Sequence, residues 1–182
     1  GLMIYSFNER LRFSKGARQE TDAETILSLL DGCVTVEASG VALDKLGVDY
    51  IATLRRGAEV FVDAKTRERG CSRYWNGDPE LAIERWSVIP GGKYNRDFPK
   101  AGWTLDEQKK TDMILYTFHP SDCEIAFLLP FQSLRIAARR CIDQWEKAYK
   151  VDVQDSGSWQ SQAVFVPATV VIRAITATFV ST

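Results

Sequence analysis

The chain has 182 residues, 45% of them hydrophobic, and a net charge of −1, which predicts one folded domain and excludes DNA binding driven by overall charge, though not by a local basic face. One histidine and four widely spaced cysteines argue against a structural zinc site, a Ser-His-Asp triad and histidine acid–base chemistry. Because the cysteines form no closely spaced pair, we expect free thiols in a cytoplasmic protein. No apolar run approaches the ~20 residues of a membrane span, so we expect no membrane partner.

In chain order, the first element expected is a helix from about Lys15 to Leu30, capped by Ser14. A short strand is predicted over Cys33–Ala38. Next, two apolar runs flank a Gly-containing turn, which predicts a β-hairpin made of Gly47–Leu54, Arg55-Arg56-Gly57 and Ala58–Lys65.

The second half begins with a polar stretch rich in Arg, Gly, Pro, Asn and Trp, predicted to be an irregular insertion at about 67–110 within the single domain 1–182. Two short helices are expected inside it, at Pro79–Trp86 and Thr104–Lys110. The remaining predicted elements are strands at Met113–Phe118 and Glu124–Leu129, an amphipathic helix at Phe131–Lys150, and a β-rich tail at Ala163–Val180 with a break near Pro167.

The hairpin carries the most informative side chains. Because side chains alternate along a strand, Asp63 and Lys65 share one face, and hairpin pairing brings Asp49 beside them. Two carboxylates and an amine on an otherwise apolar strand pair predict a site for a hard divalent cation that activates water. The alternatives are an exposed ion pair between Asp63 and Lys65, and an Asp49 that merely begins a strand.

This element order and the motif Asp49…Asp63-Ala64-Lys65 resemble the PD-(D/E)XK nuclease superfamily. Within it, the chain is most similar to the archaeal Holliday junction resolvases, through Lys15-Gly16 followed by Glu20 and through the loop Ala38-Ser39-Gly40. The similarity covers about residues 15–66, with Val48 where the motif often has proline. It implies an α/β fold with a restriction-endonuclease-like core, in which helices flank a mixed β-sheet and the active site lies on the second and third core strands.

The resemblance implies a metal-dependent DNA endonuclease that hydrolyses phosphodiester bonds, with branched, Holliday junction-like DNA as the favoured substrate. The cofactor expected is Mg²⁺ or Mn²⁺, which prefers oxygen ligands and stabilises charge on the phosphate. Asp49 and Asp63 are expected to ligate the metal directly, and the resemblance adds the backbone carbonyl of Ala64.

Two more residues complete the expected catalytic set. Glu20 on the first helix is expected to reach the metal through water or to bind a second ion, with Glu24 one turn later as the competing carboxylate. An ordinary solvated glutamate at the start of a helix is the alternative for Glu20. Lys65, kept protonated by the carboxylates, is expected to position the attacking water or stabilise charge on the phosphate.

Contacts to DNA are expected from a loop hydroxyl and from basic side chains just after the catalytic lysine: Ser39, Arg67, Arg69 and Arg73. Arginines contact phosphates, and the aromatic residues interleaved with them stack on unpaired bases. The equal alternative for this stretch is a small satellite core under a long loop, with its charges facing water.

Two other functions remain open. A non-catalytic nucleic-acid-binding or assembly module could retain the nuclease fold, although such a module has no need for the combination of Glu20, Asp49, Asp63 and Lys65. A nuclease toxin or a phage protein would share the chemistry and differ in biology. Resolvases of this type are symmetric dimers, so the resemblance also implies a homodimer.

Overall fold

The computed structural model describes residues 3–6, 19–67, 78–94, 98–118 and 125–180. The chain packs as two compact units. Unit 1 comprises residues 1–74 and 108–130, and unit 2 comprises residues 75–107 and 131–182. All the predicted catalytic residues therefore belong to unit 1.

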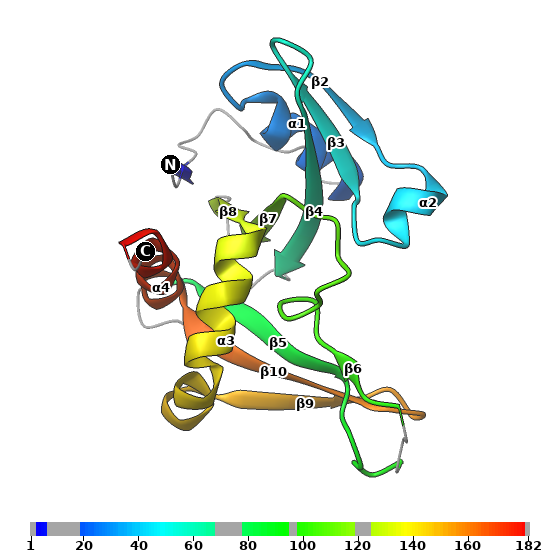
Figure 1. The fold of residues 1–182 in the computed structure, drawn as a ribbon, viewed down its shortest axis with the longest axis vertical. Coiled ribbons are helices and arrows are strands. Elements are labelled where there is room, and N and C mark those ends of the chain that lie inside the picture. Colours follow the sequence, from blue (N-terminus) through cyan, green and yellow to red (C-terminus); the bar gives the residue numbers. More distant parts are fainter. Residues whose placement is uncertain (1–2, 7–18, 68–77, 95–97, 119–124, 181–182) are drawn as a thin grey trace. The chain divides into compact units, whose positions relative to one another are not determined.

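Unit 1 is built on one six-stranded sheet with the order β1-β8-β7-β4-β3-β2. Strands β4 and β7 run parallel, and the other neighbouring pairs are antiparallel, so the sheet is mixed and the α/β class is confirmed. Figure 1 shows β2, β3 and β4 side by side. The elements are β1 (Met3–Ser6), α1 (Gln19–Ser28), β2 (Cys33–Ala38), α2 (Val41–Asp44), β3 (Tyr50–Leu54), β4 (Glu59–Arg67), β7 (Met113–Phe118) and β8 (Ile125–Pro130).

The predicted hairpin is confirmed as β3 and β4. Tyr50 lies opposite Val62, and the register continues toward the turn. Arg56 and Gly57 adopt φ values of 80° and 78°, the left-handed conformation that a tight hairpin turn requires. The pairing fixes which side chains share a face, and so it fixes where the polar residues of β4 project.

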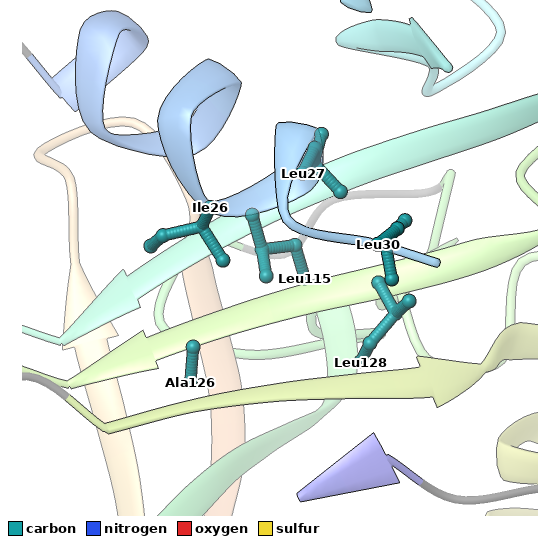
Figure 2. A pocket seen from close by; sticks show the side chains of 6 residues that line it. All are labelled: Ile26, Leu27, Leu30, Leu115, Ala126 and Leu128. Atoms are coloured by element: carbon teal, nitrogen blue, oxygen red, sulfur yellow. The ribbon is translucent and has the colours of Figure 1, made fainter. Parts of the chain in front are cut away.

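Helix α1 packs on the sheet face that carries Tyr50 and Val62. Beneath the helix is a small hollow with wholly apolar walls, shown in Figure 2 and lined by Ile26, Leu27, Leu30, Leu115, Ala126 and Leu128. Apolar walls lack the polar groups that orient a substrate. Asp63 and Lys65, which alternate with Val62 and Ala64, project from the other face of the sheet.

Unit 2 contains a four-stranded antiparallel sheet with the order β6-β5-β10-β9. Helices α3 and α4 pack against each other and against β10. The side chain of Arg85 links β5 to α3 through ion pairs of 2.8 Å to Asp143 and 2.6 Å to Glu146. The elements of unit 2, drawn in Figure 1, are β5 (Glu80–Val88), β6 (Lys100–Ala101), α3 (Phe131–Ala148), β9 (Val151–Asp155), β10 (Gln160–Pro167) and α4 (Ala168–Val180).

The predictions for the stretch 67–110 were wrong where the structure describes it. Instead of an irregular insertion with a helix at Pro79–Trp86, it contributes β5 and β6 to the second sheet, with Leu81 and Ile83 buried two residues apart as in a strand. The expected helix at Thr104–Lys110 is also absent from this described segment. The buried Thr104 hydroxyl instead accepts a hydrogen bond from the Glu84 backbone N–H.

The β-rich tail was right only as far as Pro167, where β10 ends and helix α4 begins. β-Branched residues suggested a strand, but Ala168, Val171 and Ile175 are buried at helical spacing. The strand at 33–38 and the helix that begins at Phe131 are confirmed, and the first helix is described from Gln19 onward. None of the described helices has the length and apolar character that crossing a membrane requires.

Candidate active site

Asp49 is fastened to the partner strand of the hairpin on both sides of Asp63. Its backbone N–H donates to the Val62 carbonyl at 2.9 Å, and its Oδ2 accepts a hydrogen bond from the Ala64 N–H at 2.8 Å. Gly47, with φ of 79°, turns the chain into this position just before β3 begins. The structure thus places Asp49 directly beside Asp63, as hairpin pairing predicts.

Asp63 is the buried centre of the site, with its side chain 3% exposed. The Nζ atom of Lys65 lies 3.1 Å from its Oδ1 and 2.9 Å from its Oδ2. A second ammonium, from Lys109, lies 2.8 Å from Oδ2, and the side chain of Lys109 is 6% exposed. Both ammonium groups are thus within ion-pair distance of the same carboxylate oxygen. The alternative of an exposed ion pair on a strand is therefore wrong for Asp63.

The two carboxyl groups are close enough to share a proton through a hydrogen bond, so the pKa of each depends on the other. Burial, followed by this hydrogen bond, raises the pKa of Asp49 to about 6, against the opposing effect of the Ala64 N–H. Burial also acts to raise the pKa of Asp63, but the charge of Lys65, the hydrogen bond with Asp49 and the charge of Lys109 outweigh it and lower that pKa. Asp63 is therefore the anion of the pair, and Asp49 carries the shared proton in mildly acidic solution.

The remaining predicted site residues are either engaged in contacts within the fold or have side chains outside the described part of the structure. Ser39 donates its hydroxyl to the Val48 carbonyl, so it buttresses the chain just before Asp49. Arg67 ends β4 and pairs in register with Phe118 of β7. Glu20 lies in α1, but its side chain falls outside the described part of the structure, as do Arg69 and Arg73. The roles predicted for all five of these residues stay predictions.

Lys109 is the site residue that sequence reasoning missed. No short motif of the sequence links it to Asp63. The segment after it is hydrogen-bonded to the turn before β3 and to β4: the Lys110 N–H donates to the Leu46 carbonyl at 2.9 Å, and the Asp112 N–H donates to the Phe61 carbonyl at 2.8 Å. The parallel pairing of β4 with β7 places this segment beside the site.

Gly47 provides the space that the side chain of Lys109 occupies. A Cβ at this position would lie 2.5 Å from Nζ and 2.7 Å from Cγ of Lys109. We expect Gly47→Ala to lower the free energy of unfolding by about 1–3 kcal/mol, through backbone strain and displacement of the lysine. Gly57→Ala is the matched control, since Gly57 has φ of 78° and nothing within 4 Å of its Cβ position. If Gly47→Ala and Gly57→Ala lower the free energy of unfolding in urea equally, the displacement of the Lys109 side chain does not destabilise the protein.

The donor set suits a hard cation. Asp49 and Asp63 offer carboxylate oxygens at one point, and hard divalent cations such as Mg²⁺ can be held by one or two protein carboxylates while keeping several waters. No cluster of three or more acidic, histidine or cysteine side chains occurs in the described part of the chain, from which the Glu20 side chain is missing. Asp49 and Asp63 are thus the carboxylates available there to a metal.

Comparison with known proteins gives no homologue. No model of a known protein family matches the chain, and neither a curated protein nor a solved structure matches it. Function must therefore be inferred from the chemistry of the site itself.

Proposed function

We propose that the protein is a Mg²⁺- or Mn²⁺-dependent DNA endonuclease, with a restriction-endonuclease-like core formed by the mixed sheet of unit 1. The observation that carries the proposal is the position of Asp49, which is hydrogen-bonded to Val62 and Ala64 on either side of Asp63, while the Lys65 ammonium lies 2.9 Å from Asp63 Oδ2. These three side chains lie on β4 and at the start of β3, the third and second strands of the meander β2–β3–β4.

The raised pKa of Asp49 supports a cation at this point. Burial, the largest cause of the raised pKa, makes the ionised form of Asp49 costly in the metal-free site. A divalent cation can take the place of the shared proton. Asp49 and Asp63 would hold it, with the Ala64 carbonyl as a further oxygen, and when bound it supplies Lewis acidity for phosphodiester hydrolysis.

The position of Lys65 supports its proposed role at the substrate. Its side chain is 31% exposed, whereas that of Asp63 is 3% exposed, so its ammonium bridges the buried carboxylate and solvent. A phosphate approaching from solvent would meet this charge, which stabilises negative charge on the phosphate oxygens. The contact with Asp63 keeps the ammonium in one place before the substrate arrives.

The DNA class follows only from the resemblance to junction resolvases, so branched DNA is the favoured substrate. Arg67, Arg69, Arg73 and the Ser39 loop are proposed contacts to its phosphates. A homodimer would present two such sites to two strands.

Cleavage assays test the proposal. Labelled four-way junction, duplex and single-stranded DNA are incubated with the wild type in Mg²⁺, Mn²⁺ or EDTA. We expect metal-dependent cleavage that is lost in Asp63→Asn, which removes a proposed metal ligand, and is at least about a hundredfold slower in Lys65→Met, which removes the positive charge that would meet the phosphate. Asp44→Asn, at an exposed position of α2, is the matched control and should cleave like the wild type.

Each result has a clear meaning once circular dichroism shows the variants to be folded. Cleavage that persists in EDTA or in Asp63→Asn would rule out the metal mechanism. Tight DNA binding without cleavage of any substrate would identify the binding module instead. A preference for the junction over the duplex would establish the resolvase subclass.

A further inference from the structure

We propose that Lys109 is a built-in counter-cation of Asp63 that a divalent metal must displace, so that metal binds weakly to the free protein and tightly together with a phosphate. This inference rests on the proposed function, because it concerns the same carboxylate pair. It assigns a regulatory part to a residue that lies outside the nuclease motif.

The first support is position. The Nζ atom of Lys109 lies 2.8 Å from Asp63 Oδ2, and the two side chains are 6% and 3% exposed. An ammonium this deeply buried is held by charge, since a buried lysine is stable only beside an opposite charge or after losing its proton. The Lys109 ammonium therefore lies beside Asp63 Oδ2, an oxygen that a metal would need as a ligand.

The second support is that the position is built by several elements. The chain after Lys109 is hydrogen-bonded to Leu46, in the turn before β3, and to Phe61 on β4. Gly47 leaves open the space that the aliphatic part of the lysine fills. These contacts distinguish Lys109 from a flexible surface lysine that happens to touch an acid.

The third support is charge balance. With both carboxylates ionised, Asp49 and Asp63 balance the two ammonium groups of Lys65 and Lys109 before any metal enters. A divalent cation adds two positive charges close to both ammonium groups, and repulsion at such distances is strong away from bulk water. Lys65 can turn its partly exposed ammonium toward water, whereas the buried Lys109 is screened least from the metal, so displacement of Lys109 is the step that limits metal binding. A bound phosphate brings negative charge and relieves the repulsion, which couples metal binding to substrate binding.

Manganese binding without DNA tests the competition. Mn²⁺ is titrated into the wild type, Lys109→Met and Lys110→Met, with free Mn²⁺ measured by electron paramagnetic resonance. We expect Lys109→Met to bind about tenfold tighter or more, because methionine fills the same space without charge. Lys110→Met changes an exposed neighbour and should bind like the wild type. Unchanged or weaker binding in Lys109→Met would overturn the proposal and leave Lys109 as a support for Asp63.

The wild type provides a second readout that does not depend on a variant folding. Amine labelling followed by mass spectrometry should modify Lys110 readily and Lys109 slowly in metal-free protein, and Mn²⁺ should increase labelling of Lys109 several-fold. Labelling of Lys109 that ignores bound Mn²⁺ would also overturn the displacement. If the wild type binds Mn²⁺ and both tests fail, only this inference falls. If neither the wild type nor Lys109→Met binds Mn²⁺, the proposed function falls with it.

Discussion

Replacing Asp63 with alanine is expected to lower the free energy of unfolding by about 3–5 kcal/mol, because it removes the carboxylate that pairs with a buried ammonium. Asp63 also anchors Lys65 and hydrogen-bonds to Asp49. Most of the loss should come from Lys109, since the Lys65 side chain is 31% exposed and can turn to water. The proposed metal ligand Asp63 is therefore expected to stabilise the fold of unit 1 as well.

A double substitution separates these contributions. In Asp63→Ala/Lys109→Met the buried charge is gone, so we expect the double variant to be more stable than Asp63→Ala alone. Asp44→Ala, at an exposed aspartate, is the control and should change little. A double variant no more stable than the single one would mean that Lys109 does not need Asp63.

The tryptophans make the measurement specific to the unit. All five, at positions 75, 86, 103, 145 and 159, belong to unit 2. Tryptophan fluorescence in urea therefore follows unit 2, whereas far-ultraviolet circular dichroism follows both units. A shift of the circular dichroism transition with little shift in fluorescence would place the damage in unit 1.

The hairpin was predictable because its signals are local. Two alternating apolar runs around a glycine turn specify β3 and β4, and alternation then places Asp63 and Lys65 on one face. Asp49 follows from pairing alone. Lys109 was not predictable in this way, because its contact with Asp63 depends on the parallel pairing of β4 with β7, which no local pattern encodes.

In unit 2, two elements were predicted wrongly because their local sequence signals were misleading. The stretch Glu80–Val88 contains polar and charged residues that obscured its period of two, and those residues are used inside the unit: Arg85 pairs with α3 and the Glu84 N–H is bound by Thr104. In α4, the many β-branched residues led to the prediction of a strand, although tertiary packing selects a helix whose buried residues have helical spacing. Propensity failed where long-range contacts decided the local structure.

Asp49→Asn is expected to make the protein more stable at neutral pH while abolishing metal-dependent cleavage. Asparagine resembles the protonated aspartate: its carbonyl oxygen can accept from the Ala64 N–H and its amide can donate to Asp63. It removes the cost of placing a second negative charge beside Asp63. The loss of cleavage follows because the same change removes a proposed metal ligand.

The sign of the pH dependence follows from the raised pKa. The pKa of Asp49 rises from 3.8 to about 6 on folding, so the folded wild type binds the extra proton between these values. The stability that this proton contributes is fully present below pH 3.8 and is lost as the pH rises through 6. Asp63, whose pKa is lowered, acts in the opposite direction and at lower pH, where stability falls as it becomes protonated.

The advantage of Asp49→Asn over the wild type should therefore be near zero at pH 4 and grow to about 1–2 kcal/mol at pH 7.5, a value reduced for the partial exposure of Asp49. Urea unfolding of both proteins in metal-free buffer at pH 4, 5.5 and 7.5 measures it, with Asp44→Asn as the exposed control that should show no such trend. An Asp49→Asn protein that loses stability relative to the wild type as the pH rises would mean that Asp49 is stabilised as an anion. Because Mn²⁺ would replace the shared proton in the proposed site, adding it should raise the stability of the wild type at pH 7.5 and leave Asp49→Asn nearly unchanged. The acidic pair would then be a site whose instability without metal is the source of its affinity for metal.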